Sequence, residues 1–241
     1  MDDQFDIVDF HSHILPIDHG CDSLQTALSQ LKLAKSAGVK RIVLTPHFYP
    51  HIDDLGAFLE KRSEAYSALV SEISNFDEYP DIILGCELLI CEGISNMPDI
   101  DELCISGTKT LLLELPFSDF SDRYVDDIET LISRGYNVVL AHADRYNTYN
   151  IDKLLSVGAR VQINADALCA LFLSKAIKNW LSGGYVSAIG SDIHMLNKKY
   201  YNRFKRAGKL ILKKYPAVIL ASDEIWNSAT KENPELSENN T

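Results

Sequence analysis

The sequence predicts an α/β fold in which parallel strands alternate with helices in a barrel-like sheet. Seven short apolar stretches recur along the chain, and segments between them show helical spacing. Most of the stretches end in a histidine or a carboxylate, and α/β enzymes build their active sites at the carboxyl ends of their strands. The chain has 241 residues, of which 46% are hydrophobic, as is ordinary for one barrel domain.

The expected strands are short runs rich in Val, Ile and Leu, bounded by polar or glycine-containing segments. A regular alternation of such runs with helices indicates parallel pairing, because parallel neighbours need a crossover between them. The seven runs are Ile7–Phe10, Arg41–Thr45, Ile82–Cys86, Thr110–Leu115, Val138–Ala141, Ala159–Asn164 and Val186–Gly190.

The expected helices have apolar residues at helical spacing and glycines near their ends. In the first, Leu24, Ala27 and Leu31 recur on one face and Gly38 follows as a C-terminal signal. From Thr230 the sequence is polar, so we expect a single domain over residues 1–229 and a disordered tail over 230–241. The helices are Ser23–Ala37, Leu55–Ile73, Tyr124–Ser133, Ile151–Ser156, Leu171–Leu181, Arg203–Lys214 and Ala217–Trp226.

Composition excludes several classes of function. A formal net charge of −11 argues against nucleic acid as a partner, and no apolar run approaches the ~20 residues of a membrane span. The N-terminal segment MDDQFD is acidic where a signal peptide needs basic residues. The five cysteines form no CxxC pair, so we expect reduced thiols in a cytoplasmic protein without membrane insertion.

The polar residues at the strand ends are typical metal ligands. Imidazole and carboxylate groups without thiolate suit catalytic Zn, Mn or Fe. A HxH pair alone is as often a solvated turn or a structural histidine, and a single His47 after a strand is more often hydrogen-bonded than metal-bound. Glu114 within LLLELPF is the sharpest signal, because a buried carboxylate is costly unless it is paired or binds a metal. The candidates are His11, His13, His47, Glu87, Glu114, His142, Asp192 and His194.

The order of the motifs HSHILP, TPH, GCE, LLLELPF, AHADRY, QINADAL and SDIH resembles the polymerase-and-histidinol-phosphatase (PHP) superfamily. Within it, the sequence is most similar to the capsule-biosynthesis protein-tyrosine phosphatases that act on bacterial tyrosine autokinases. The resemblance extends from about Asp9 to Asn197. It implies a distorted (β/α)7 barrel of the PHP type that binds two or three divalent ions, usually Mn, with Fe, Zn or Co as alternatives.

The resemblance also assigns roles to individual residues. The eight strand-end candidates match the metal ligands of the family, and Arg145 of AHADRY matches a residue that binds the substrate phosphate. The turn LPIDHG is one residue shorter than in the family, with His19 where a second aspartate binds metal, so a third site would carry less negative charge. Lys199 lies where the family has an Arg-Pro-Pro segment, and it would supply a point charge to the phosphate instead of a bidentate fork.

The expected chemistry is hydrolysis of a phosphate monoester by metal-activated hydroxide that attacks phosphorus. Arg145 would stabilise the charge on the phosphate, and Asp144 or His194 would protonate the leaving phenolate. No Cys-x5-Arg loop is present, so no phosphocysteine is expected.

Two alternatives to a tyrosine phosphatase remain open. One is a PHP phosphatase of a small metabolite such as histidinol phosphate or a sugar or nucleotide phosphate. The other is a metal-binding regulator of capsule assembly with weakened catalysis.

Overall fold

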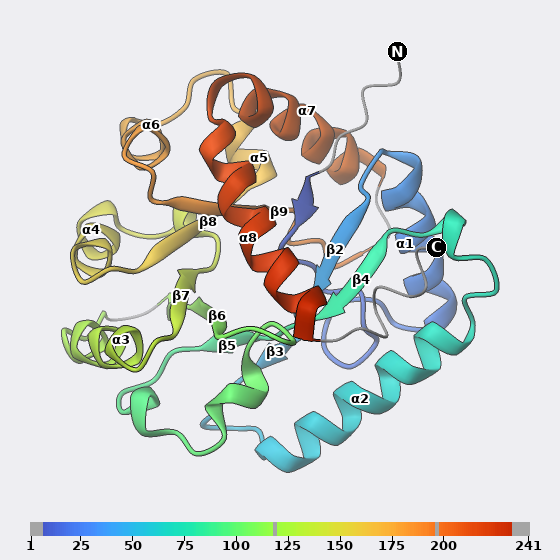
Figure 1. The fold of residues 1–241 in the computed structure, drawn as a ribbon, viewed down its shortest axis with the longest axis horizontal. Helices are drawn as coiled ribbons and strands as arrows, with labels where there is room; N and C mark the ends of the chain where they lie inside the picture. Colours follow the sequence, from blue (N-terminus) through green and yellow to red (C-terminus); the bar gives the residue numbers. More distant parts are fainter. Residues whose placement is uncertain (1–6, 118–119, 196–197, 233–241) are drawn as a thin grey trace.

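All nine strands of the described residues are parallel and belong to one sheet (Figure 1). The computed structural model describes residues 7–117, 120–195 and 198–232. The sheet order is β3-β5-β6-β7-β8-β9-β1-β2-β4. The strands are β1 Val8–Asp9, β2 Arg41–Leu44, β3 His47–Phe48, β4 Asp81–Leu84, β5 Glu87–Leu89, β6 Thr110–Glu114, β7 Asn137–Leu140, β8 Arg160–Asn164 and β9 Val186–Gly190.

The nine strands form a closed ring of seven, because two of the expected strands each resume, after a break of two residues, as a short strand beyond the expected end. β2 continues into β3 after Thr45 and Pro46, and β4 continues into β5 after a break of the same length. Pairing resumes in the same register, with Leu44 opposite Leu84 and His47 opposite Glu87. β5 then pairs with β6, and β1 pairs with both β2 and β9, so each of the seven strands has two neighbours. The predicted distorted (β/α)7 barrel is confirmed.

The interruption has a local cause and a consequence for the site. Pro46 has no N–H to donate, yet its carbonyl oxygen accepts the Glu87 N–H at 3.0 Å, so the two strands stay together across the break. The Gly85 N–H bonds to the Leu44 carbonyl oxygen at 2.8 Å, and a Cβ on Gly85 would lie 3.0 Å from the Val43 side chain. The break therefore brings His47 and Glu87 side by side at the end of the barrel.

Helices cover the outside of the barrel, and side-chain caps fix where several of them begin. Ser23, Asp54, Asn147 and Ser174 each accept a hydrogen bond from a backbone N–H of the following turn. The helices are α1 Leu24–Ser36, α2 Leu55–Ser71, α3 Arg123–Ser133, α4 Thr148–Ser156, α5 Ala165–Leu168, α6 Lys175–Ser182, α7 Lys198–Lys214 and α8 Pro216–Glu232, with short 3₁₀ turns at Phe76–Glu78, Ile94–Asn96, Ile100–Leu103 and Ala143–Arg145.

Three helix boundaries differ from the sequence prediction by four residues or more. The helix expected from Leu171 begins at Lys175, because Ser174 caps it and the preceding loop stays irregular. α7 begins five residues before the expected Arg203. α8 extends to Glu232, six residues beyond the expected end at Trp226. Residues 233–241 of the expected polar tail lie outside the described residues, and the domain limits stay a prediction.

The interior of the barrel is apolar at one end and polar at the other. α8 crosses the ring of strands in Figure 1, and its Trp226 and Ala229 pack with Val8, Val43 and Ala188 in one buried cluster. Towards the carboxyl ends of the strands, the buried residues of β6 and β8 include carboxylate and amide side chains instead. The barrel is thus closed by α8 at its amino end, and polar groups gather at its carboxyl end.

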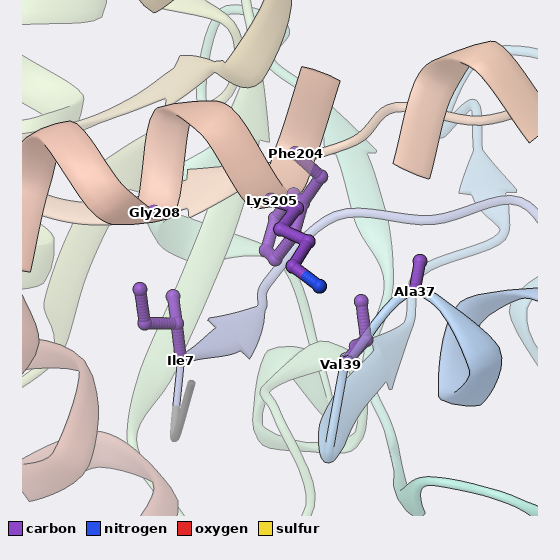
Figure 2. Close-up of a pocket in the computed structure, with 7 residues that line it drawn as sticks. Ile7, Ala37, Val39, Phe204, Lys205 and Gly208 are labelled. Carbon is purple, nitrogen blue, oxygen red and sulfur yellow. The ribbon is translucent and has the colours of Figure 1, made fainter. Parts of the chain in front are cut away.

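α7 packs closely against the amino ends of β1 and β2. The gap between them is about 10 Å³, room for about one water molecule (Figure 2). It is lined by Ile7 and Val39 from the strand side and by Phe204, Lys205 and Gly208 from α7. No helix among the described residues has the length and apolar character needed to cross a bilayer.

Candidate metal centre

Eight of the nine predicted ligands converge at the carboxyl end of the barrel. They come from the chain after β1, from β3, β5 and β6, and from the chain after β7 and β9. Their possible ligand atoms form four overlapping groups, each with all atoms within 4.8 Å of one another. The groups are His13, His47 and His194; His11, His13 and Asp192; His11, Glu87 and His142; and His47, Glu87 and Glu114.

Glu87 lies at the centre of this cluster and is completely buried. Its Oε2 lies 3.0 Å from His11 Nε2, 3.2 Å from His13 Nε2 and 3.0 Å from His47 Nδ1. Its Oε1 lies 2.8 Å from His142 Nε2. Despite these distances, Oε2 has no hydrogen-bond partner of acceptable geometry, and neither does His47 Nδ1. Buried lone pairs that converge without hydrogen bonds fit a bound cation.

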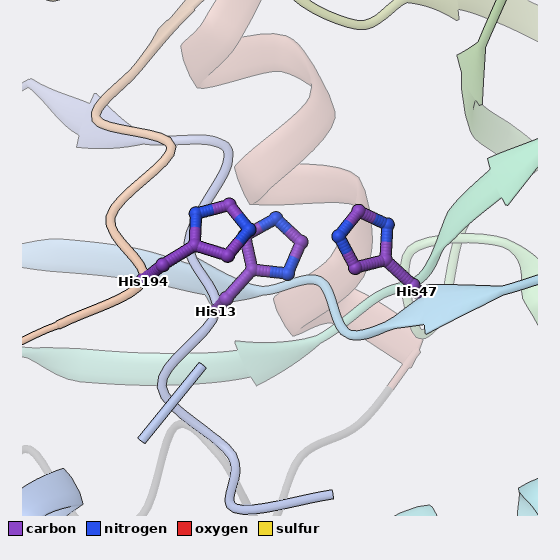
Figure 3. A group of neighbouring side chains, drawn as sticks. All are labelled: His13, His47 and His194. Atoms are coloured by element: carbon purple, nitrogen blue, oxygen red, sulfur yellow. The ribbon is translucent and has the colours of Figure 1, made fainter. Parts of the chain in front are cut away.

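Three histidines stack at the mouth of the cluster (Figure 3). The His13 ring lies between the other two, with its centroid 4.0 Å from that of His194 and 4.3 Å from that of His47. His11 Nε2 and His13 Nε2 are 3.0 Å apart. Ring nitrogens from three different segments therefore face a small common volume, as the ligands of a multinuclear centre would.

Two of the candidate ligands have an unusual backbone. His142 has a φ of 30° and Asp192 a φ of 51°, both in the left-handed region that disfavours side chains. Among the described residues only Asp99 shares this property outside glycine. The Asp192 N–H bonds to the His11 carbonyl oxygen at 2.8 Å, and the His142 N–H bonds to Gln162 Oε1 at 2.6 Å. These bonds hold two sharp turns that direct both side chains inward.

A second set of side chains orients the candidate ligands, and sequence reasoning missed it. Asp18 Oδ2 accepts a hydrogen bond from the His47 N–H at 3.0 Å and lies 3.0 Å from His13 Nδ1. Gln162 Oε1 lies 3.1 Å from His11 Nδ1, and Asn164 Nδ2 donates to Asp192 at 3.1 Å. Such partners fix the ring and carboxylate orientations of metal ligands. The sequence signal that could have identified Gln162 and Asn164 is their alternate spacing in the apolar strand VQIN, which places both amide side chains on one face.

The electrostatics of the cluster favour a cation. Burial alone would raise the pKa of Glu87, but the facing imidazoles, His11 first, hold it well below its ordinary value. Burial and the nearby charge of Glu87 raise the pKa of Glu114 to about 7. Burial would lower the pKa of His13, yet the facing carboxylates of Asp18, Asp192 and Glu87 raise it well above its ordinary value. Without metal, protons on His11 and His13 balance the buried carboxylates, and divalent ions can take their place.

The remaining predicted residues lie around the cluster. Arg145 is half-exposed, and its Nη2 donates to Asp192 Oδ2, which places the guanidinium at the centre's edge. Asp144 Oδ1 accepts the Asn164 N–H at 2.8 Å. His19 is exposed, with its ring 5.0 Å from that of His47, and belongs to none of the four groups found among the described residues. Lys199 lies in the first turn of α7 with an exposed side chain.

Comparison with known proteins identifies the family. Residues 7–230 match the family described as capsular polysaccharide synthesis, CpsB/CapC. The chain belongs to this family. The resemblance inferred from the motifs is thereby confirmed.

Relatives within the family cover most of the chain. Tyrosine-protein phosphatase YwqE from Bacillus subtilis (strain 168) is 26% identical over 210 residues, which are 81% of this chain and 80% of YwqE. CapC from Staphylococcus aureus, provisionally named a tyrosine-protein phosphatase, is 28% identical over 217 residues. These residues are 80% of this chain and 79% of CapC.

A solved structure shows the same fold. The structure belongs to work on YwqE from Bacillus subtilis and CpsB from Streptococcus pneumoniae, which are described as unique metal-dependent tyrosine phosphatases. It superposes with a TM-score of 0.71 at 22% identity over 93% of each chain.

Proposed function

We propose that this protein is a metal-dependent protein-tyrosine phosphatase that acts on an autophosphorylated tyrosine kinase in capsular or exopolysaccharide synthesis. The observation that carries the proposal is the buried cluster around Glu87, with four imidazoles facing one carboxylate and Arg145 at its edge. The family and the names of its relatives supply the biological setting.

The centre would hold two or three divalent ions, with Mn as the proposed physiological metal and Fe, Zn or Co as alternatives. The donors are imidazole nitrogens and carboxylate oxygens, which suit these metals. Bound ions would lower the pKa of a coordinated water and neutralise phosphate charge. The proposed ligands of the first two ions are His11, His13, His47, Glu87, Glu114, His142, Asp192 and His194, and His19 is the proposed addition at a third.

Residues at the edge of the centre would bind the phosphate and handle the proton. Arg145 pairs with Asp192, so its guanidinium needs only a short shift to form two hydrogen bonds to phosphate oxygens. Lys199 would add a point charge from the first turn of α7. Asp144, fixed through Asn164, or His194 would hold the proton for the leaving phenolate.

Aromatic side chains beside the centre favour an aryl phosphate over a sugar phosphate. Phe117 follows β6 and is 72% exposed. Its ring is nearly parallel to that of His142, with centroids 6.5 Å apart and an interplanar angle of 12°, and it lies 5.6 Å from the ring of Tyr146. A phenyl group whose phosphate reached the cluster would pack against these rings. A sugar phosphate, which has no aromatic ring, would leave Phe117 in water.

We place the enzyme in the cytoplasm, in keeping with five cysteines that are all free thiols.

The test of the proposed function is hydrolysis of a phosphotyrosine peptide, histidinol phosphate and a sugar phosphate by metal-loaded protein. A preference of at least about tenfold in kcat/KM for the peptide is expected. Equal or greater activity on a small metabolite would favour the metabolic phosphatase, and no turnover with any of them would favour the regulator.

A further inference from the structure

α7 carries a concentration of positive charge on an otherwise acidic protein. Eight of the 23 Lys and Arg residues lie in its 17 residues, and it has no Asp or Glu. The rest of the chain therefore has 15 basic against 34 acidic residues, a net charge of −19. Such a separation gives the molecule one face that attracts anions and a remainder that repels them.

The charges of α7 point outward because its apolar face is used for packing. Tyr201, Phe204, Ala207 and Ile211 are buried against the body of the domain. Arg206 and Lys213 are exposed on the opposite side, Lys214 is exposed on the flank that faces residues 169–173, and Lys205 is exposed on the other flank beside Ile7 and Val39. One nearby acid, Asp166, pairs with Arg203 at 2.5 Å and neutralises that residue. Arg206, Lys213 and Lys214 therefore lie on the outer face of the helix and on its flank towards residues 169–173.

Two apolar side chains project beside this charged face. Leu171 is 90% exposed and Phe172 is 81% exposed, in the loop between α5 and α6. Between this loop and α7 runs a groove of about 390 Å³, whose lining includes both side chains together with Lys178, Arg206 and Lys214. Projecting apolar residues flanked by basic ones are characteristic of proteins that bind the surface of a membrane.

We propose that α7 and the loop 169–173 form a docking surface for an anionic lipid membrane, with Leu171 and Phe172 entering the headgroup region. A fluid surface accommodates two projecting side chains without a preformed partner pocket, and anionic lipids complement the charge of α7. A nucleic acid fits less well, because Leu171 and Phe172 would then lie beside a polar sugar-phosphate backbone instead of entering an apolar phase.

The position of α7 relates this surface to the metal centre. α7 follows β9 and the His194 segment, so its first turn lies near the carboxyl end of the barrel. From there it extends roughly 25 Å for its 17 residues. A membrane along its outer face would leave the metal centre open beside the lipid surface. Substrates held at the membrane would then reach the centre without dissociating.

The test is co-sedimentation of the full chain with vesicles. We expect binding to phosphatidylcholine vesicles that contain phosphatidylglycerol, none to phosphatidylcholine alone, and a loss of binding as salt increases. At roughly 5-fold per charge, the Lys213→Gln/Lys214→Gln variant should partition about 25-fold less strongly. Leu171→Ser/Phe172→Ser should also weaken binding, while Lys32→Gln/Lys109→Gln and Phe76→Ser serve as matched controls on other faces.

Hydrolysis of a small aryl phosphate in free solution should be unchanged in all four variants, which separates this surface from the proposed catalysis. Three results would overturn the proposal: no binding to anionic vesicles, equal loss in the control variants, or binding of an acidic peptide to α7 that vesicles do not share.

Discussion

Replacement of Glu87 by glutamine is the perturbation to which the centre should be most sensitive. Glu87 belongs to two of the four ligand groups and faces four imidazoles. Glutamine keeps the volume and removes the charge. A cation that takes the place of the proton between Glu87 Oε2 and His11 Nε2, which are 3.0 Å apart, would lose an attraction of about 5 kcal/mol per unit charge at an effective dielectric constant of about 20. Since about 1.4 kcal/mol is a factor of ten, we expect metal affinity and turnover to fall by about 10³-fold or more.

The assay combines elemental analysis of the purified Glu87→Gln protein with hydrolysis of a phosphotyrosine peptide, and circular dichroism confirms that the variant is folded. Glu92→Gln is the control, because Glu92 is an exposed carboxylate that pairs with Arg123 at 2.8 Å away from the cluster. The metal content and the kcat of this control variant should stay within about twofold of those of the unmodified protein. A folded Glu87→Gln protein with normal metal content and normal kcat would refute the reasoning.

Three further substitutions test separate parts of the account. Arg145→Ala should lower kcat by roughly 10²-fold with unchanged metal content, and Arg145→Lys should recover only part; near-normal kcat on aryl phosphates would remove its role. Phe117→Ala should lower kcat/KM several-fold for phosphotyrosine but not for phosphoserine peptides, and an equal loss on both would argue against ring recognition. Gly190→Ala should reduce metal occupancy and thermal stability, because its Cβ would lie 2.5 Å from His11 Cβ and 2.8 Å from Gln162 Nε2; a variant as stable and metal-rich as the original protein would contradict this packing.

The ring of strands and the convergence of the ligands were predictable for a topological reason. Parallel strands in a barrel bring their carboxyl ends together, so polar residues such as Glu114 and His142 at those ends must meet. The interruptions around Pro46 and Gly85 were not predictable, because they depend on pairing between segments far apart in the sequence.

The supporting residues were harder to find than the candidate ligands. Asp18 acts through His13 and the backbone of His47, and no local pattern distinguishes it from a turn aspartate. Gln162 and Asn164 alternate in an apolar strand, a signal that becomes specific only once the inner face of the barrel is known. The start of α6 is set by the Ser174 cap. The apolar residues from Leu171 onward have helical spacing, so the sequence predicted an earlier start.

The most direct test of the central claim is the metal content of the purified protein, measured together with its phosphotyrosine phosphatase activity before and after exhaustive chelation. The account predicts at least two divalent ions per chain, loss of activity when they are removed, and recovery with Mn or Co. Full activity in protein from which all metal has been removed would contradict it.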